Sequence, residues 1–158
     1  YTAVSIYNGR DIALLHLSTP LTFNTNIQPI CYPESDNVLG TAISTCDQKI
    51  YGWGRTDVND TVPTTILQKL DVTLTESTTA CSNLTDGRVI CVKGDPPSSS
   101  TCSGDSGGPL VVRYGGRAFV TGIDSYKSHR SPTICGTGYS GYTRTATFSP
   151  WVAGYINA

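Results

Sequence analysis

Three glycines crowd one serine in the segment Thr101–Leu110, and this arrangement is typical of a serine that does chemistry. Glycine adopts backbone conformations that other residues avoid, so Gly104, Gly107 and Gly108 permit a sharp turn that exposes the Ser106 hydroxyl. The turn also aims backbone N–H groups, those of Gly104 and Ser106, at one point, as in an oxyanion hole. The segment therefore predicts a nucleophilic serine, followed at once by an apolar strand.

The heptapeptide Gly104–Leu110 resembles the nucleophile signature of the chymotrypsin-like (trypsin family) serine proteases. The G-x-S-x-G elbow of the α/β-hydrolases fits the same letters, and Asp124 and His129 do follow the serine. That elbow needs a helix directly after the serine, whereas Pro109–Val112 is typical of a β-strand. We therefore favour the trypsin family over the α/β-hydrolases and over a plain Gly/Ser-rich surface turn.

Asp11 stands at the entrance of an apolar run, Ile12–Leu17, which predicts a buried strand after a turn. The segment Arg10–Leu15 resembles the one that carries the triad aspartate in this family, and it precedes the serine as the family order His, Asp, Ser demands. By this resemblance Asp11 orients the base histidine and stabilises its charged form. The alternative is an aspartate that only ends a turn.

No histidine precedes Asp11, so the base of the triad is missing from these residues. His16 lies within the predicted strand, which cannot fold back on Asp11, and we expect a half-buried structural side chain. His129 is expected to be an exposed loop residue. We therefore expect an N-terminal segment or a second chain of the same protease to carry the histidine. The alternative is a catalytically inactive homologue that acts as a binding or structural subunit.

The resemblance implies an all-β fold, the chymotrypsin-like double β-barrel. Residues 1–20 would be a remnant of the N-terminal barrel, residues 21–47 the inter-barrel connection, and residues 48–158 the complete C-terminal barrel with a terminal helix. The local patterns agree, because residues typical of strands recur over Lys49–Trp53, Ile66–Leu74, Val89–Val92, Leu110–Tyr114 and Arg117–Ile123. In the helix, Ser149 is expected to cap and Pro150 to fill the first turn, with an apolar face of Trp151, Val152, Tyr155 and Ile156.

Composition limits the function classes. The chain has 158 residues, of which 38% are hydrophobic, and no apolar run long enough to span a membrane. With 11 basic and 12 acidic residues it lacks the positive field that binds nucleic acid. We expect a protein or peptide substrate and neither a cofactor nor a metal ion. Because methionine and a signal peptide are both absent, we expect a processed or clipped piece.

Six cysteines and two Asn-x-Thr sequons, at Asn59 and Asn83, indicate an oxidising, secretory environment and a secreted, extracellular glycoprotein. By resemblance to the family, two disulfides are expected, and the second would join the two walls of the substrate pocket. They are Cys81 to Cys91 and Cys102 to Cys135.

Cys31 and Cys46 are then left over. The segment Gln28–Pro33 resembles the linker of family members whose catalytic domain is disulfide-bonded to a pro-segment, so Cys31 would hold a second chain. The usual family partner of Cys46 falls at Val112 in this sequence. Either the two cysteines pair with each other or each reaches into the missing segment.

By the same resemblance, Ser100 forms the floor of the primary substrate pocket, where trypsin-like members carry an aspartate. A neutral floor cannot offset the desolvation of a buried cation, so we expect apolar rather than basic residues to be accepted. Asp124 would restore a negative charge if it lines the pocket wall. Lys127, where the family commonly has glycine, would narrow the entrance or attract acidic side chains.

Three further roles come from the resemblance. The strand edge of Ser125, Tyr126 and Lys127 would hydrogen-bond an extended substrate, and Ser125 would also lie near Asp11. Ser140 would line the opposite wall of the pocket. In the zymogen mechanism of the family, Asp105 receives the new N-terminus after cleavage.

Overall fold

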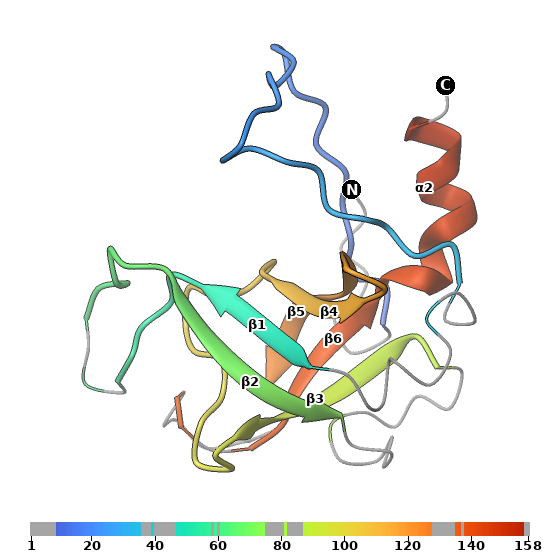
Figure 1. Cartoon of the computed structure of the whole chain (residues 1–158). Helices are drawn as coiled ribbons and strands as arrows, with labels where there is room; N and C mark the ends of the chain where they lie inside the picture. The colour runs from blue at the N-terminus through green and yellow to red at the C-terminus, as the bar shows by residue number, and fades with distance from the viewer. Residues whose placement is uncertain are drawn as a thin grey trace.

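A closed, antiparallel β-barrel dominates this computed structural model, which describes residues 9–35, 39, 47–57, 59, 61–74, 81, 87–127, 135–136 and 138–156. Around the barrel the described strands follow the order β1-β2-β3-β6-β5-β4 (Figure 1). The strands are β1 (Gln48–Gly52), β2 (Gln68–Leu74), β3 (Val89–Asp95), β4 (Pro109–Tyr114), β5 (Arg117–Lys127) and β6 (Ser140–Arg144). The expected all-β fold is confirmed.

The barrel interior is apolar because its strands alternate. In β2, Val72 is buried and Leu70 and Leu74 are partly buried, whereas Asp71 and Thr73 between them face solvent. Side chains from five strands meet in one core cluster, which consists of Ile50, Val72, Ile90, Val92, Leu110 and Tyr142. This core gives the loops at the barrel ends a rigid base.

A tight hairpin joins β4 to β5. Gly115 and Gly116 have φ of 56° and 76°, the left-handed values that a two-residue hairpin turn of type I′ requires at both positions. The predicted hairpin is therefore confirmed. Strand β5 continues past the predicted end at Ile123 as far as Lys127, and there it pairs with β6.

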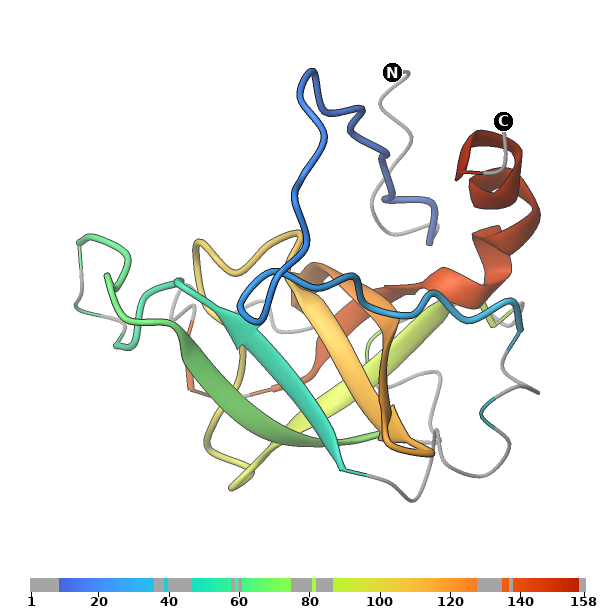
Figure 2. The same cartoon turned by 45° about the horizontal axis from the view of Figure 1, so that its top comes forward.

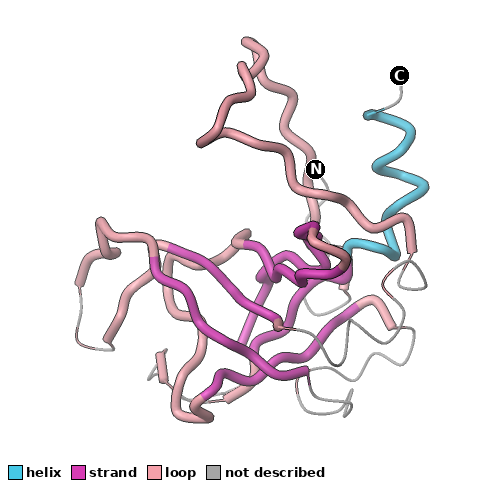
Figure 3. The backbone as a smooth tube through the Cα atoms, in the orientation of Figure 1, coloured by secondary structure: helices cyan, strands magenta, loops and turns pink. Residues whose placement is uncertain are grey.

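The strand predicted over Ile12–Leu17 is wrong. Residues 10–30 form an irregular arm that rises from the barrel and returns to it (Figures 1 and 3). Leu15 is 88% exposed, and His16, expected to be half-buried, is exposed as well. An apolar run becomes a strand only when a neighbouring strand supplies its hydrogen bonds, and the described residues place none beside it.

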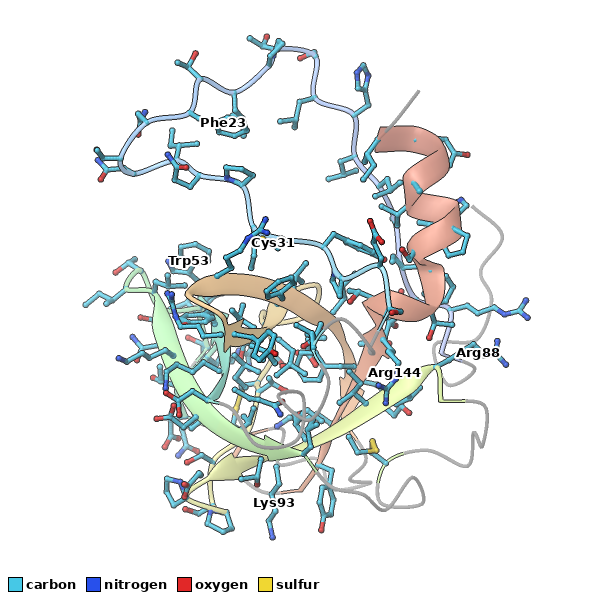
Figure 4. The ribbon with its side chains drawn as sticks, turned by 45° about the vertical axis from the view of Figure 1, so that its right-hand side comes forward. Phe23, Cys31, Trp53, Arg88, Lys93 and Arg144 are labelled. Atoms are coloured by element: carbon cyan, nitrogen blue, oxygen red, sulfur yellow. A yellow bond between two sulfur atoms is a disulfide. The ribbon has the colours of Figure 1, made fainter. Side chains whose placement is uncertain are left out.

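The chain returns to the barrel at Cys31, below the arm that carries Phe23 (Figure 4). The Cys31 N–H donates to Ala118 O and its carbonyl accepts from Val120 N, both at 3.0 Å, so Cys31 bridges to β5. Next in the chain, the Tyr32 hydroxyl donates to Thr145 O at 2.5 Å. The connection is thus fixed to the barrel at two consecutive residues.

The terminal helix exists, but two details of its prediction are wrong. A 3-10 turn, η4 (Thr145–Phe148), runs directly into α2 (Ser149–Ile156), so Ser149 has helical dihedral angles, φ −54° and ψ −45°, and is no N-cap. Figure 2 shows α2 projecting from the barrel. Of the predicted apolar face only Val152 is buried, while Tyr155 stays 66% exposed. None of the described helices has the length and apolarity to cross a membrane.

Candidate active site

The loop between β3 and β4 presents Ser106 to solvent. Gly104 and Gly107 have φ of 101° and 82°, which side chains other than glycine rarely adopt, and they place the sharp turn around the serine. The loop is fixed to β5, because Gly107 N donates to Asp124 O and Asp124 N donates to Gly108 O, both at 2.9 Å. Ser106 is therefore an exposed hydroxyl on a rigidly held turn.

Backbone donors surround this serine. The N–H of Asp105 donates to Cys102 O at 3.1 Å, and that of Gly107 donates to Asp124 O. Within the part of the chain that the structure describes, no hydrogen bond occupies the N–H groups of Gly104 and Ser106. Gly104 and Ser106 are the two residues whose N–H groups the sequence predicts to form an oxyanion hole.

The Asp105 carboxylate lies against the end of β1. Its Oδ1 accepts the N–H of Gly54 and its Oδ2 accepts the N–H of Cys102, each at 2.8 Å. A Cβ on Gly52 would stand 1.9 Å from Asp105 Oδ1, and a Cβ on Gly54 would stand 2.5 Å from it. The two glycines therefore leave the space that this carboxylate occupies, a role that sequence reasoning missed although the Gly-Trp-Gly triplet was its signal.

A pocket of about 330 Å³ lies beside this carboxylate. Its walls come from β1, β2, the residues that follow β1, the nucleophile loop with the segment before it, which contains Ser100, and residues 135–136. They include Asp105, Gly54, Arg55, Lys69, Ser99 and Gly136. The carboxylate thus borders a space large enough for a short peptide segment.

Asp11 lies against the same end of β5. Its Oδ2 accepts a hydrogen bond of 2.8 Å from Ser125 Oγ, across 114 positions of sequence. This contact is the one expected between Ser125 and Asp11. It depends on a β-bulge, because Asp124 pairs with Tyr142 and Tyr126 with Gly141, so that Ser125 has no counterpart on β6.

The strand edge expected to bind substrate is the last part of β5. The ladder with β4 ends at the pair Pro109 and Ile123, whereas the ladder with β6 continues to the pair Lys127 and Ser140. The Tyr126 ring is buried against Gly141, where a Cβ would stand 2.6 Å from the ring. Residues 125–127 therefore extend beyond β4, next to the nucleophile loop.

Ser100, the proposed pocket floor, is half-buried and hydrogen-bonded. Ser100 Oγ accepts the backbone N–H of Gly136 at 3.1 Å and the ammonium of Lys127 at 2.5 Å. Deeper in, the Thr101 and Ser140 hydroxyls are buried and lie 2.8 Å apart. The sequence analysis assigned Ser100, Ser140 and Lys127 to one site, but it did not foresee that Lys127 reaches Ser100.

Asp124 faces the interior, not solvent, with 7% of its surface exposed. Burial raises the pKa of its carboxyl to about 7, helped by the charge of Asp105 and opposed by Lys127 and a hydrogen bond from Thr101. Its Oδ1 has no hydrogen-bond partner among the described residues. Burial lowers the pKa of Lys127. The negative charges of Asp124 and Asp105 partly offset this lowering.

Both expected disulfides are confirmed, Cys81 to Cys91 and Cys102 to Cys135. Cys31 is a free thiol, partly buried against Leu39 and Phe119. Cys46, which was to pair with Cys31 or with another segment, lies outside the described residues, as does the Asn83 sequon.

Two other residues complete the comparison with the sequence. Asn59 is exposed, and its backbone and side-chain N–H groups donate to Asp57 Oδ1 at 2.8 and 2.9 Å. His129 lies outside the described residues. Whether either sequon carries sugar stays a prediction.

The chain matches the protein-family model described as Trypsin over residues 1–152. It is 36% identical to the fibrinolytic enzyme, isozyme C, of Lumbricus rubellus, over 96% of this chain and 64% of that protein. Serine proteinase stubble of Drosophila melanogaster is 31% identical over 92% of this chain and 19% of its own length. Transmembrane protease serine 7 of Mus musculus is 35% identical over 92% of this chain and 18% of its length. The chain spans less than two thirds of each of these relatives.

Proposed function

Because this chain belongs to the trypsin family, we propose that it is part of a serine endopeptidase that hydrolyses peptide bonds through an acyl-enzyme. One observation carries the proposal. The turn that exposes Ser106 hydrogen-bonds to Asp124 through Gly107, and the next residue, Ser125, holds the Asp11 carboxylate. The nucleophile and the acid of a triad are thereby attached to one rigid strand.

In the proposed reaction, Ser106 Oγ attacks the carbonyl carbon of the scissile bond and gives its proton to a histidine. The N–H groups of Gly104 and Ser106 hold the negative oxygen of the tetrahedral intermediate. The intermediate collapses when the histidine protonates the leaving amine. Water, deprotonated by the same histidine, then hydrolyses the ester on Ser106, and the serine recovers its proton.

The histidine is proposed to come from a segment or chain outside this one. The base must contact both Asp11 and Ser106. His16 is exposed on the arm, five residues after Asp11, and is therefore not proposed as this base. Asp11 would accept the Nδ1–H of the incoming histidine and so direct its Nε2 at the serine. The hydrogen bond from Ser125 holds the carboxylate in place for this contact.

The exposed apolar side chains of the arm favour an additional segment or chain that covers them. Residues 1–20 are proposed to complete an N-terminal barrel, residues 21–47 to connect the barrels, and residues 48–158 to form the C-terminal barrel and helix. Large apolar side chains of the arm are exposed, among them Leu15, Leu17, Leu21, Phe23 and Ile27. The free thiol of Cys31 could join the partner covalently. Exposed apolar side chains in this number are typical of a surface that another segment covers.

Asp105 is proposed to act in activation. Its carboxylate is partly buried beside the pocket described above and holds two backbone N–H groups. An α-amino group inserted there would form an ion pair with it and fix the loop of Ser106. We further propose a secreted, extracellular glycoprotein made as a zymogen, on the strength of the disulfides and the exposed Asn59.

The test is peptide hydrolysis by the complete catalytic domain and by its Ser106→Ala variant. The variant should lose roughly 10⁴-fold or more in kcat while its stability stays unchanged, because an exposed hydroxyl contributes little to folding. Ser103→Ala is the matched control, a second serine of the same loop. Turnover of the Ser106→Ala variant near the normal rate would refute the assignment and favour the alternative, an inactive homologue used for binding.

A further inference from the structure

The side chain of Lys127 reaches Ser100, the residue that the family resemblance places at the floor of the substrate pocket. Its ammonium donates to Ser100 Oγ, which also accepts the N–H of Gly136, and both partners flank the disulfide between Cys102 and Cys135. Lys127 is partly buried, so its charge has lost part of its water. The proposed pocket floor therefore carries a cation, held on Ser100 Oγ.

We propose that Lys127 makes this pocket select an aspartate or glutamate side chain on the residue before the scissile bond. The proposal rests on the endopeptidase function proposed above. It replaces the expected preference for apolar residues, which assumed that Ser100 is a neutral floor. With the ammonium on Ser100, the floor is positively charged.

Three kinds of substrate side chain meet this cation differently. A lysine or arginine would place a like charge against Lys127 in a partly desolvated site. An apolar side chain would push the ammonium away from Ser100 and offer it no new acceptor. A carboxylate would accept a charge-assisted hydrogen bond from the ammonium, which is about twice as strong as a neutral one.

Asp124 modulates the charge of this pocket. It is buried next to Thr101, and the ionisable groups that affect it are Asp105, Lys127 and Tyr142. The Tyr142 phenol stays neutral, since burial raises its pKa well above its usual value. When Asp124 is protonated, below its pKa of about 7, it does not offset the charge of Lys127. The preference for acidic residues should therefore be largest below that pH and fall above it.

The experiment uses the complete catalytic domain with four peptide amides that differ only in Glu, Gln, Leu or Arg before the scissile bond. Glu and Gln have the same shape, so their ratio of kcat/KM isolates the charge. We expect Glu to exceed Gln by about 10- to 100-fold, the range of a hydrogen bond between charged groups. Taking the ratio at each pH also cancels the titration of the histidine, and this ratio should fall between pH 6 and 8.5.

Variants assign the effect to one residue. Lys127→Met keeps the length of the side chain and should bring the Glu to Gln ratio close to one, while Lys127→Arg should keep it high. Lys49→Met is the control, because it removes a positive charge from the barrel surface, where Lys49 pairs with Asp71. This control should leave the ratio unchanged.

A fluorophosphonate titration of Ser106 accompanies each assay and counts the working sites. Full labelling with a Glu to Gln ratio near one, or with Leu or Arg as the best substrate, overturns the specificity and leaves the endopeptidase function standing. A preference for Arg would indicate that the charge of Asp124, and not that of Lys127, determines the specificity of the pocket. Absence of labelling overturns both proposals.

Discussion

At the scale of single residues, a buried carboxyl and a partly buried ammonium lie near each other at the end of β5. Asp124 is almost fully enclosed, and Lys127 lies three positions further along β5. Each is more costly to bury in its charged form, which is why the pKa of Asp124 is raised and that of Lys127 is lowered. Keeping either group charged in the folded state therefore costs folding free energy.

Replacing Asp124 by Asn should change how stability depends on pH. The folded-state pKa of Asp124 is raised from 3.8 to about 7, so its contribution is fully present below 3.8 and is lost as pH rises through 7. The loss is about 1.4 kcal/mol per pH unit at most. Asp124→Asn should be more stable than the parent at pH 8 and not at pH 4. Urea unfolding in a Ser106→Ala background, which prevents self-digestion, measures this difference; equal pH profiles would contradict it.

Ser125 donates a hydrogen bond of 2.8 Å to Asp11, and we propose that it positions this carboxylate. Ser125→Ala should lower kcat about 10-fold and leave KM unchanged, because the triad is loosened while substrate contacts remain. Asp11→Asn should lower kcat far more, roughly 10⁴-fold, as expected for a histidine left in the wrong tautomer. Ser125→Thr keeps a hydroxyl and should restore most of the rate. A rise in KM alone would show that Ser125 acts on substrate instead.

At the scale of elements, the end of β1 and the nucleophile loop fit together through missing side chains. Gly52 and Gly54 contact the Asp105 carboxylate at distances that no Cβ tolerates. Gly104, in the loop itself, would bring a Cβ within 3.1 Å of the Gly54 Cα. The position of Ser106 therefore depends on a strand more than fifty residues earlier in the chain.

Gly52→Ala should displace the Asp105 carboxylate, because the added Cβ would stand 1.9 Å from Oδ1. We expect loss of most activity together with a destabilisation of at least about 1 kcal/mol. Gly154→Ala is the matched control, since nothing lies within 4 Å of its Cβ position in α2. It should stabilise the helix by about 0.5–1 kcal/mol at full activity. Thermal unfolding and peptide hydrolysis of both variants measure these effects. A fully active Gly52→Ala enzyme would contradict the proposal that Gly52 leaves the space for the Asp105 carboxylate.

Local patterns predicted the elements for which the barrel supplies pairing partners. The alternation of Leu70, Val72 and Leu74 and the Gly115–Gly116 turn each specify their structure within a few residues. The run Ile12–Leu17 has the same apolar content, yet it forms no strand, because pairing requires a second strand that local sequence cannot supply. The contact of Lys127 with Ser100 was equally beyond prediction, since it depends on which way a flexible side chain turns across a pocket.

At the scale of the whole molecule, the apolar arm and the free face of α2 both project from an otherwise closed barrel (Figure 2). An exposed apolar segment without a partner favours aggregation. The chain by itself, 16.8 kDa, should therefore be poorly soluble. Intact-mass analysis of the native protease with and without reductant should reveal a second polypeptide, released by reductant if Cys31 binds it. A folded, monodisperse species of 16.8 kDa alone would argue against this.

The central claim is that Ser106 is a nucleophile activated by a histidine that this chain does not supply. Labelling with a fluorophosphonate, with the modified residue located by mass spectrometry, tests both halves of the claim at once, because only a serine with a working base and oxyanion hole reacts quickly. Ser106 should be labelled in the complete protease and remain unlabelled when the isolated chain is treated in the same way. Failure of Ser106 to react in the complete protease, or equally fast labelling in the isolated chain, would contradict the claim.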